Sequence, residues 1–152
     1  MTRTERDTFR TAREVLARAI AYSDSIEQRL RHADVPERTR TSLLQGAFAA
    51  EQSKLTQSLN RYLDEAPEEV LDTFVQYSAS LPDPLPEPAS SFTPESLTQW
   101  LLDVHQPLQE LFSEVTDAVV ATPAQNVFEN LTEFVRTHEM RIVQAADGAQ
   151  DL

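Results

Sequence analysis

The 152-residue sequence predicts an all-α protein, built as two helical hairpins joined by one long crossover. Three observations support this prediction. Apolar residues recur at alternating steps of three and four along four long stretches, which is the period of an amphipathic helix. No stretch of useful length alternates apolar and polar residues as a half-buried strand does. A proline-rich segment separates the first two stretches from the last two, and it is longer than the loop of a simple up-and-down bundle.

The first two helices are expected over about residues 6–32 and 37–64, with Asp34 and Pro36 between them. Ala66-Pro67 ends the second helix, because proline lacks the backbone N–H that a helix interior requires. A short apolar stretch at 70–75 is consistent with one or two further turns. The inward face of the first helix comprises Phe9, Ala12, Leu16, Ala19, Ser23, Ile26 and Leu30. The inward face of the second comprises Leu44, Phe48, Glu51, Leu55, Ser58 and Tyr62.

The crossover is expected over about residues 66–93. Its stretch 81–88 holds four of the nine prolines, which favours extended, polyproline-like chain. An adaptor that docks this stretch into an aromatic-lined groove is one alternative. The prolines alternate as Pro-x-Pro and form no PxxP motif, so a stiff spacer is the favoured interpretation.

The last two helices are expected over about 94–121 and 124–146, with a frayed tail after them. Thr93 followed by Pro94 is a typical helix start, and Thr122-Pro123 repeats it. Pro107 lies inside the third helix and predicts a kink. The inward face of the third helix comprises Leu97, Leu101, Val104, Leu108, Leu111, Val115 and Ala118. The inward face of the fourth comprises Ala124, Phe128, Leu131, Val135, His138, Ile142 and Ala145.

Composition excludes several classes of function. The chain has no cysteine, so thiol chemistry and cysteine-ligated metals are excluded, and its two glycines cannot form a glycine-rich phosphate loop. A net charge of −12 argues against binding to nucleic acid or to an anionic membrane. No apolar run reaches the length of a membrane-spanning helix, and the N-terminus lacks a signal-peptide pattern. A single cytoplasmic domain over residues 1–152 is expected.

Polar residues interrupt the apolar faces near the midpoint of each helix. They are Ser23 in the first helix, Glu51 in the second and His138 in the fourth, with His105 beside the face of the third. Midpoints of antiparallel helices lie at similar heights, so these residues are expected to share one central layer. A buried carboxylate there requires a compensating partner.

This pattern resembles the ferritin-like superfamily, in particular its small rubrerythrin-type members. In that family each hairpin supplies a Glu from its first helix and a Glu-x-x-His from its second, and together they bind two irons. The stretches 47–55 and 126–139 resemble the second and fourth helices of such a protein. The ligand motif itself is degenerate. Glu51-Gln52-Ser53-Lys54 and Val135-Arg136-Thr137-His138 stand where Glu-x-x-His is expected, and Ser23 and His105 stand at the two other Glu positions. Di-iron chemistry is therefore not expected.

Two interpretations of the central layer remain. In one, Glu51, His105 and His138 bind a single iron or zinc ion. In the other, which we favour, they form a hydrogen-bonded polar cluster in which Lys54 reaches Glu51 in place of a metal. No catalytic or cofactor-binding residue is assigned. We expect a non-catalytic binding or structural protein that forms a homodimer, as the resemblance implies, with an unidentified protein as a further partner.

Overall fold

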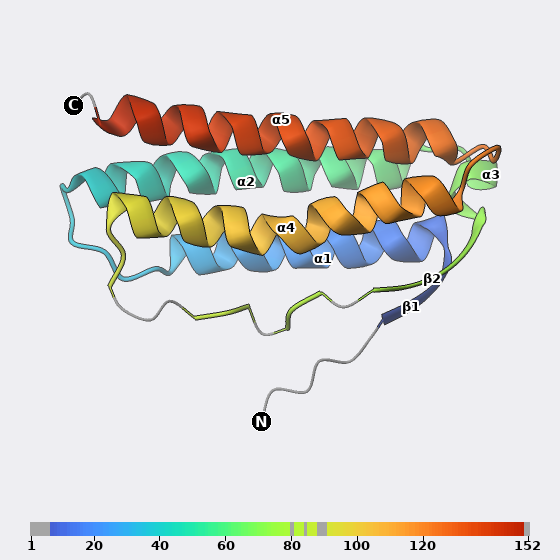
Figure 1. Ribbon diagram of the computed structural model, residues 1–152, viewed down its shortest axis with the longest axis horizontal. Helices are drawn as coiled ribbons and strands as arrows, with labels where there is room; N and C mark the ends of the chain where they lie inside the picture. Colours follow the sequence, from blue (N-terminus) through green and yellow to red (C-terminus); the bar gives the residue numbers. More distant parts are fainter. Residues whose placement is uncertain (1–6, 80, 84, 88–90, 151–152) are drawn as a thin grey trace.

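The computed structural model describes residues 7–79, 81–83, 85–87 and 91–150, and the described chain is mostly helical. Four long helices lie lengthwise beside one another, and we call them the bundle: α1 (Ala12–Arg31), α2 (Arg40–Glu65), α4 (Pro94–Ala118) and α5 (Gln125–Gln150). Figure 1 shows that α1 and α2 run in opposite directions, as do α4 and α5, whereas α2 and α4 run in the same direction. The segment between α2 and α4 therefore returns along the length of the bundle.

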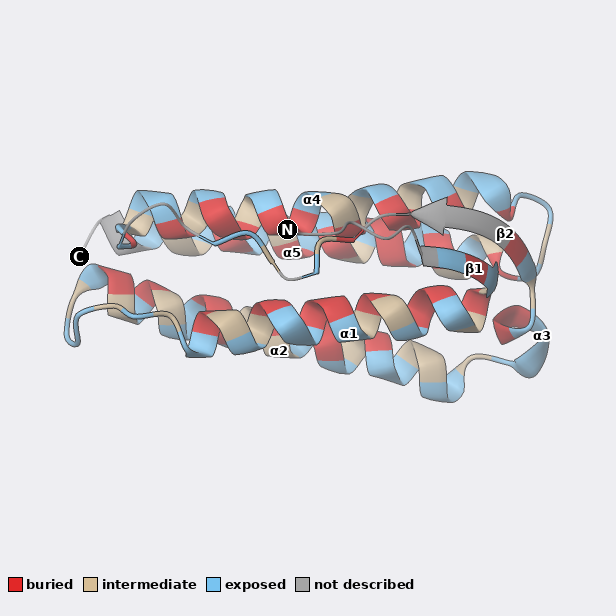
Figure 2. Ribbon diagram, turned by 90° about the horizontal axis from the view of Figure 1, so that it is seen from below, coloured by how far each residue is buried: buried red, intermediate tan, exposed pale blue. Residues whose placement is uncertain are grey.

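The bundle consists of two helix pairs. Helix α1 packs on α2 and α4 packs on α5, and the pairs meet where α2 contacts α5 and α1 contacts α4. Figure 2 shows the pairs as two layers. The predicted inward faces of the first, third and fourth helices are buried in this core, except that Ala118 is exposed and Ala145 is half-buried. The largest fully buried side chains include Tyr22, Phe48, Phe112 and Phe128.

Threonine side chains begin three of the helices. Thr11 Oγ1 accepts a hydrogen bond from the Glu14 N–H at 3.4 Å at the start of α1. Thr39 and Thr93 form capping boxes, each with a serine three residues on, so that a side chain satisfies an N–H that the first helical turn leaves unpaired. Thr93 and Pro94 thus start α4 as the sequence predicts.

The ends of the first two helices differ from the expected positions. Residues 7–11 form a strand where the first helix was expected to begin at residue 6, and residue 6 itself lies outside the described residues. Helix α2 begins at Arg40 rather than at 37, because Thr39 has extended backbone angles and caps the helix.

The ends of the last two helices also differ. Helix α4 ends at Ala118 rather than at 121, and Ala121 has a φ of 64°, a left-handed conformation that does not continue a helix. Helix α5 runs from Gln125 to Gln150, so the fraying expected after residue 146 is wrong for 147–150, and 151–152 lie outside the described residues. Helix α4 continues through Pro107, and Figure 1 shows a bend near its middle.

A small antiparallel sheet, which the sequence analysis did not predict, lies beside one end of the bundle. It pairs β1 (Asp7–Thr11) with β2 (Phe74–Ala79), with Phe9 opposite Tyr77 and an irregularity between Phe9 and Thr11. The sheet contacts α1 and α4 (Figure 2). Phe9 and Val75 are buried against the core, so each strand adds an apolar side chain to it.

The crossover is anchored to the bundle along its course. It begins with the short helix α3 (Glu68–Leu71) and with β2, and its remaining described residues form neither helix nor strand. Trp100 of α4 donates a hydrogen bond from its ring nitrogen to the Pro86 carbonyl at 2.8 Å, and its ring packs edge-on against Phe92. Arg29 of α1 forms an ion pair with Glu87. Pro84 and Pro88 of the proline-rich stretch lie outside the described residues.

Candidate functional site

A layer of polar side chains crosses the middle of the bundle, with at least one residue from each long helix. It consists of Ser23 from α1, Gln52 and Thr56 from α2, His105 from α4 and His138 from α5. Ser23, Gln52 and His105 are fully buried, and His138 is 4% exposed. Ser23, His105 and His138 thus lie at a common height, as expected. We call the five residues Ser23, Gln52, Thr56, His105 and His138 the polar layer.

Gln52 is the centre of the polar layer. Its Oε1 lies 2.7 Å from His105 Nε2 and 3.3 Å from His138 Nε2. Its Nε2 lies 2.8 Å from Ser23 Oγ and 3.4 Å from the Ser23 carbonyl. One amide group therefore connects α2 to the three other long helices.

The hydrogen-bond partners determine which atoms carry protons. A backbone carbonyl only accepts, so the Gln52 amide nitrogen faces Ser23 and its oxygen faces the histidines. Both histidines therefore donate from Nε2. Thr56 donates to the Gln52 carbonyl at 3.0 Å, so the Ser23 hydroxyl donates to Thr56 Oγ1 at 2.7 Å. This leaves His105 Nδ1 as a buried acceptor without a partner among the described residues.

Burial keeps both histidines neutral at pH 7, and donation from Nε2 to Gln52 is compatible with that form. Burial lowers the pKa of His105 well below 6.5, and the neighbouring His138, whose ring centroid lies 4.8 Å away, lowers it further. Burial lowers the pKa of His138 to about 4. The negative charge of Glu51 opposes this effect, whereas Arg141 adds to it.

Glu51 lies beside the polar layer and not within its hydrogen-bond network. Its Oε1 accepts an ion-paired hydrogen bond from Lys54 Nζ at 3.2 Å, the contact that the sequence suggested. Its side chain is only 19% exposed, and its Oε2 is buried without a partner among the described residues. Lys54 therefore compensates part of the charge that Glu51 brings to this partly buried position.

The predicted metal ligands do not come together as a set. In the part of the chain that the structure describes, no group of three or more His, Cys, Asp or Glu side chains is placed to hold a metal ion. Both histidine Nε2 atoms point at the amide oxygen of Gln52, and Glu51 Oε1 contacts Lys54. The arrangement thus differs from the three-ligand site predicted from Glu51, His105 and His138, and the two-iron set of the ferritin-like family does not fit it.

The predicted inward face of α2 is right at Leu44, Phe48 and Leu55, which are buried. It is wrong at Glu51, Ser58 and Tyr62, which are half-buried, and Gln52 was therefore not identified. A step of three from Phe48 leads to Glu51, whereas a step of four leads to Gln52. Leu55 fits both choices, whereas the buried Leu59, seven positions after Gln52, favours the second. The apolar Leu59 was the signal that could have identified this face.

Comparisons of the chain with protein-family models, with curated proteins and with solved structures find no match. Among the described helices, none is both long and apolar enough to cross a membrane.

Proposed function

We propose that this chain is a non-catalytic binding or structural protein of ferritin-like architecture, in which the polar layer stabilises the bundle instead of holding two irons. The observation that supports this proposal is the position of Gln52, whose amide group forms hydrogen bonds with Nε2 of both histidines and with Ser23 inside the buried core. Side chains that are buried and hydrogen-bonded to one another offer a substrate no access.

The helix arrangement supports the ferritin-like part of the proposal. That family also joins antiparallel helix pairs by a long crossover and directs polar side chains from all four helices to the bundle centre. Here Ser23, Gln52, His105 and His138 stand at that level, and the crossover with α3 and β2 runs alongside the bundle (Figure 1).

Elemental analysis of the untagged protein tests the proposal directly. The protein is dialysed against iron, zinc and manganese in turn, and bound metal is measured for the wild type and for His138→Ala. We expect no stoichiometric metal in either protein, together with a lower free energy of unfolding for His138→Ala. One ion bound per wild-type chain and lost in His138→Ala would contradict the proposal.

A mononuclear iron or zinc site is the second candidate. It is favoured by Glu51 Oε2 and His105 Nδ1, which are buried without partners among the described residues. Buried unpaired acceptors of this kind suit a cation. Metal uptake by this site should disappear in Glu51→Ala as well as in His138→Ala.

We further propose that the protein acts in the cytoplasm as a homodimer. Leu43 near the start of α2 and Met140 and Val143 near the end of α5 are 60%, 62% and 43% exposed. The two helices are antiparallel neighbours, so these apolar residues lie at the same end of the bundle (Figure 1). Analytical ultracentrifugation should give twice the mass of the chain, and Met140→Glu should shift the equilibrium to the monomer.

A further inference from the structure

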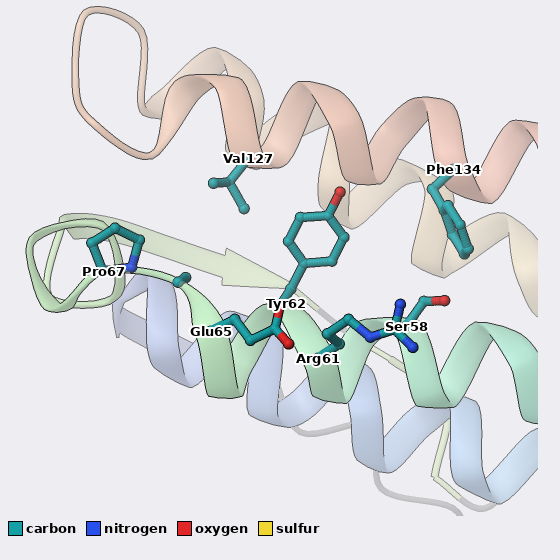
Figure 3. Close-up of a pocket in the computed structure, with 8 residues that line it drawn as sticks. Ser58, Arg61, Tyr62, Glu65, Pro67, Val127 and Phe134 are labelled. Carbon is teal, nitrogen blue, oxygen red and sulfur yellow. The ribbon is translucent and has the colours of Figure 1, made fainter.

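A cavity of about 490 Å³ lies between the C-terminal half of α2 and the N-terminal half of α5, away from the polar layer. Figure 3 shows Ser58, Arg61 and Tyr62 on α2 facing Val127 and Phe134 on α5 across it. The volume lies within the range of small-molecule sites in proteins.

The polar side chains of this cavity form no hydrogen bonds with other described residues. Ser58, Arg61 and Tyr62 make no side-chain hydrogen bond or ion pair with any residue that the structure describes. Elsewhere in the described chain, many basic side chains form ion pairs with Asp or Glu: Arg13, Arg29, Arg31, Lys54 and Arg136. Arg61, which has no ion-pair partner among the described residues, therefore presents a positive charge to the cavity in a chain whose net charge is −12.

The charge and the apolar surface are arranged side by side. In Figure 3 the Arg61 guanidinium points toward Ser58 and away from Glu65. The Tyr62 ring points toward α5 and stands between Val127 and Phe134. The side chains of Tyr62, Val127 and Phe134 are half-buried and pack against the core. They form an apolar wall next to the positive charge of Arg61.

We propose that this cavity binds a small organic monoanion, a carboxylate with an aromatic or short aliphatic body. The inference rests on the proposed binding function and names its ligand class. The guanidinium of Arg61 and the hydroxyl of Ser58 bind the carboxylate, because a planar guanidinium matches its geometry. The apolar body lies against Tyr62 and Phe134. Glu65, at the other end of the cavity, disfavours ligands that carry a second negative charge.

Three probes of matched size test the charge requirement: 4-phenylbutyrate, 4-phenylbutanol and 4-phenylbutylamine. Each is titrated into the ¹⁵N-labelled full chain, and amide chemical shifts are followed. We expect saturable shifts with 4-phenylbutyrate, centred on the amides of α2 and α5 that line the cavity. The alcohol and the amine should bind about tenfold more weakly or not at all, because each lacks the charge-assisted hydrogen bond to Arg61.

Two variants locate the site. Arg61→Gln should weaken 4-phenylbutyrate binding by about tenfold or more, whereas Arg38→Gln, at an exposed loop position, should leave it unchanged. Val127→Trp fills the cavity and should abolish binding while the helical circular dichroism spectrum is retained. No saturable shift up to about 10 mM 4-phenylbutyrate, equal binding of the three probes, or no effect of Arg61→Gln would each overturn the inference.

Failure of this inference and failure of the proposed function give different results. The cavity test depends on Arg61 and Val127, whereas the metal test depends on Glu51 and His138. A metal-free protein that binds none of the probes overturns the ligand site and leaves the non-catalytic proposal standing. A stoichiometric metal that is lost in His138→Ala overturns the proposed function, whatever binds in the cavity.

Discussion

Gln52 has an amide oxygen that contacts two buried histidines and an amide nitrogen that contacts Ser23. An amide suits this position because it supplies an acceptor on one side and donors on the other while carrying no charge. A carboxylate at position 52 would accept from the histidines but could not donate to the Ser23 carbonyl. Removing the Gln52 side chain leaves several buried polar groups without partners. Each unpaired group destabilises the folded state by more than a typical hydrogen bond stabilises it.

We predict that Gln52→Leu lowers the free energy of unfolding by about 2–4 kcal/mol at pH 7, measured by urea denaturation. The reason is the loss of partners for His105, His138 and Ser23 in a core that excludes water. Gln57→Leu is the matched control, because Gln57 lies on the same helix and is exposed; it should change stability by less than about 0.5 kcal/mol.

A triple variant separates unpaired polarity from poor packing. When His105→Leu and His138→Leu are added to Gln52→Leu, most of the unpaired groups disappear and apolar side chains replace them. The triple variant should therefore be more stable than Gln52→Leu alone. A triple variant less stable than Gln52→Leu would show that unpaired polar groups are not the cause of the destabilisation in Gln52→Leu.

Tyr22 makes a second buried polar contact, to a backbone carbonyl of α4. Its hydroxyl donates to the Val104 carbonyl at 2.6 Å, and burial raises the pKa of this hydroxyl. Pro107 follows three residues later, and a proline ring pushes the preceding turn of a helix open. The Tyr22 hydroxyl thus satisfies a carbonyl next to the interruption in α4.

Tyr22→Phe should lower the free energy of unfolding by about 1–2 kcal/mol, since it removes a buried hydrogen bond to the Val104 carbonyl. Tyr62→Phe removes a hydroxyl that bonds no described residue, and its effect should stay below about 0.5 kcal/mol. Chemical denaturation of both variants at pH 7 measures the difference. Equal losses for the two would mean that the Tyr22 hydrogen bond contributes nothing.

Among the elements, β1 connects the sheet to the start of α1. Thr11, the last residue of β1, caps α1, and the next N–H, that of Ala12, donates to the Thr73 carbonyl at 3.0 Å beside β2. The strand therefore fixes the first turn of the helix against the crossover. Phe9 in this strand is 4% exposed, whereas Phe74 of β2 is 66% exposed.

Phe9→Ala should cost about 3 kcal/mol of unfolding free energy, because a fully packed ring leaves a cavity between the strand and the bundle. Phe74→Ala deletes the same ring from a solvent-exposed site of the same sheet and should cost less than about 0.5 kcal/mol. Thermal and urea unfolding of the two variants tests this. Similar costs would contradict the burial of β1 against the core.

The all-α class and the inward faces of α1, α4 and α5 could be predicted because long amphipathic stripes report directly which side of a helix is buried. The face of α2 was less well determined, since Glu51 and Gln52 both fit a polar interruption and only Leu59 favours the second. The strands could not be predicted, because β1 is short and its Phe9 also continues the apolar stripe of α1. A strand of this kind is stabilised by its partner, which lies more than sixty residues away in the sequence.

At the scale of the whole molecule, the buried histidine pair links stability to pH. The pair lies where the two helix layers meet, with His105 on α4 and His138 on α5. Both rings donate to Gln52 of α2, and no room remains for the hydration that a charged imidazolium requires. Protonation of either ring therefore destabilises the packing of the α4–α5 pair against the α1–α2 pair.

We predict that the free energy of unfolding falls as the pH is lowered from 6.5 to 5. An unfolded histidine takes up its proton near pH 6.5, whereas His138 in the folded protein does so only near pH 4, so the unfolded state binds more protons across this window. The full difference for His138 corresponds to about 3 kcal/mol once the pH reaches 4, and His105 adds to it in the same direction. Glu139, whose pKa is raised by burial, acts in the opposite direction. Urea denaturation at several pH values should therefore show a shallower pH dependence for His138→Gln than for the wild type. His32→Gln, which changes an exposed histidine at the end of α1, should keep the wild-type slope, and equal slopes for all three proteins would exclude the buried pair as the cause.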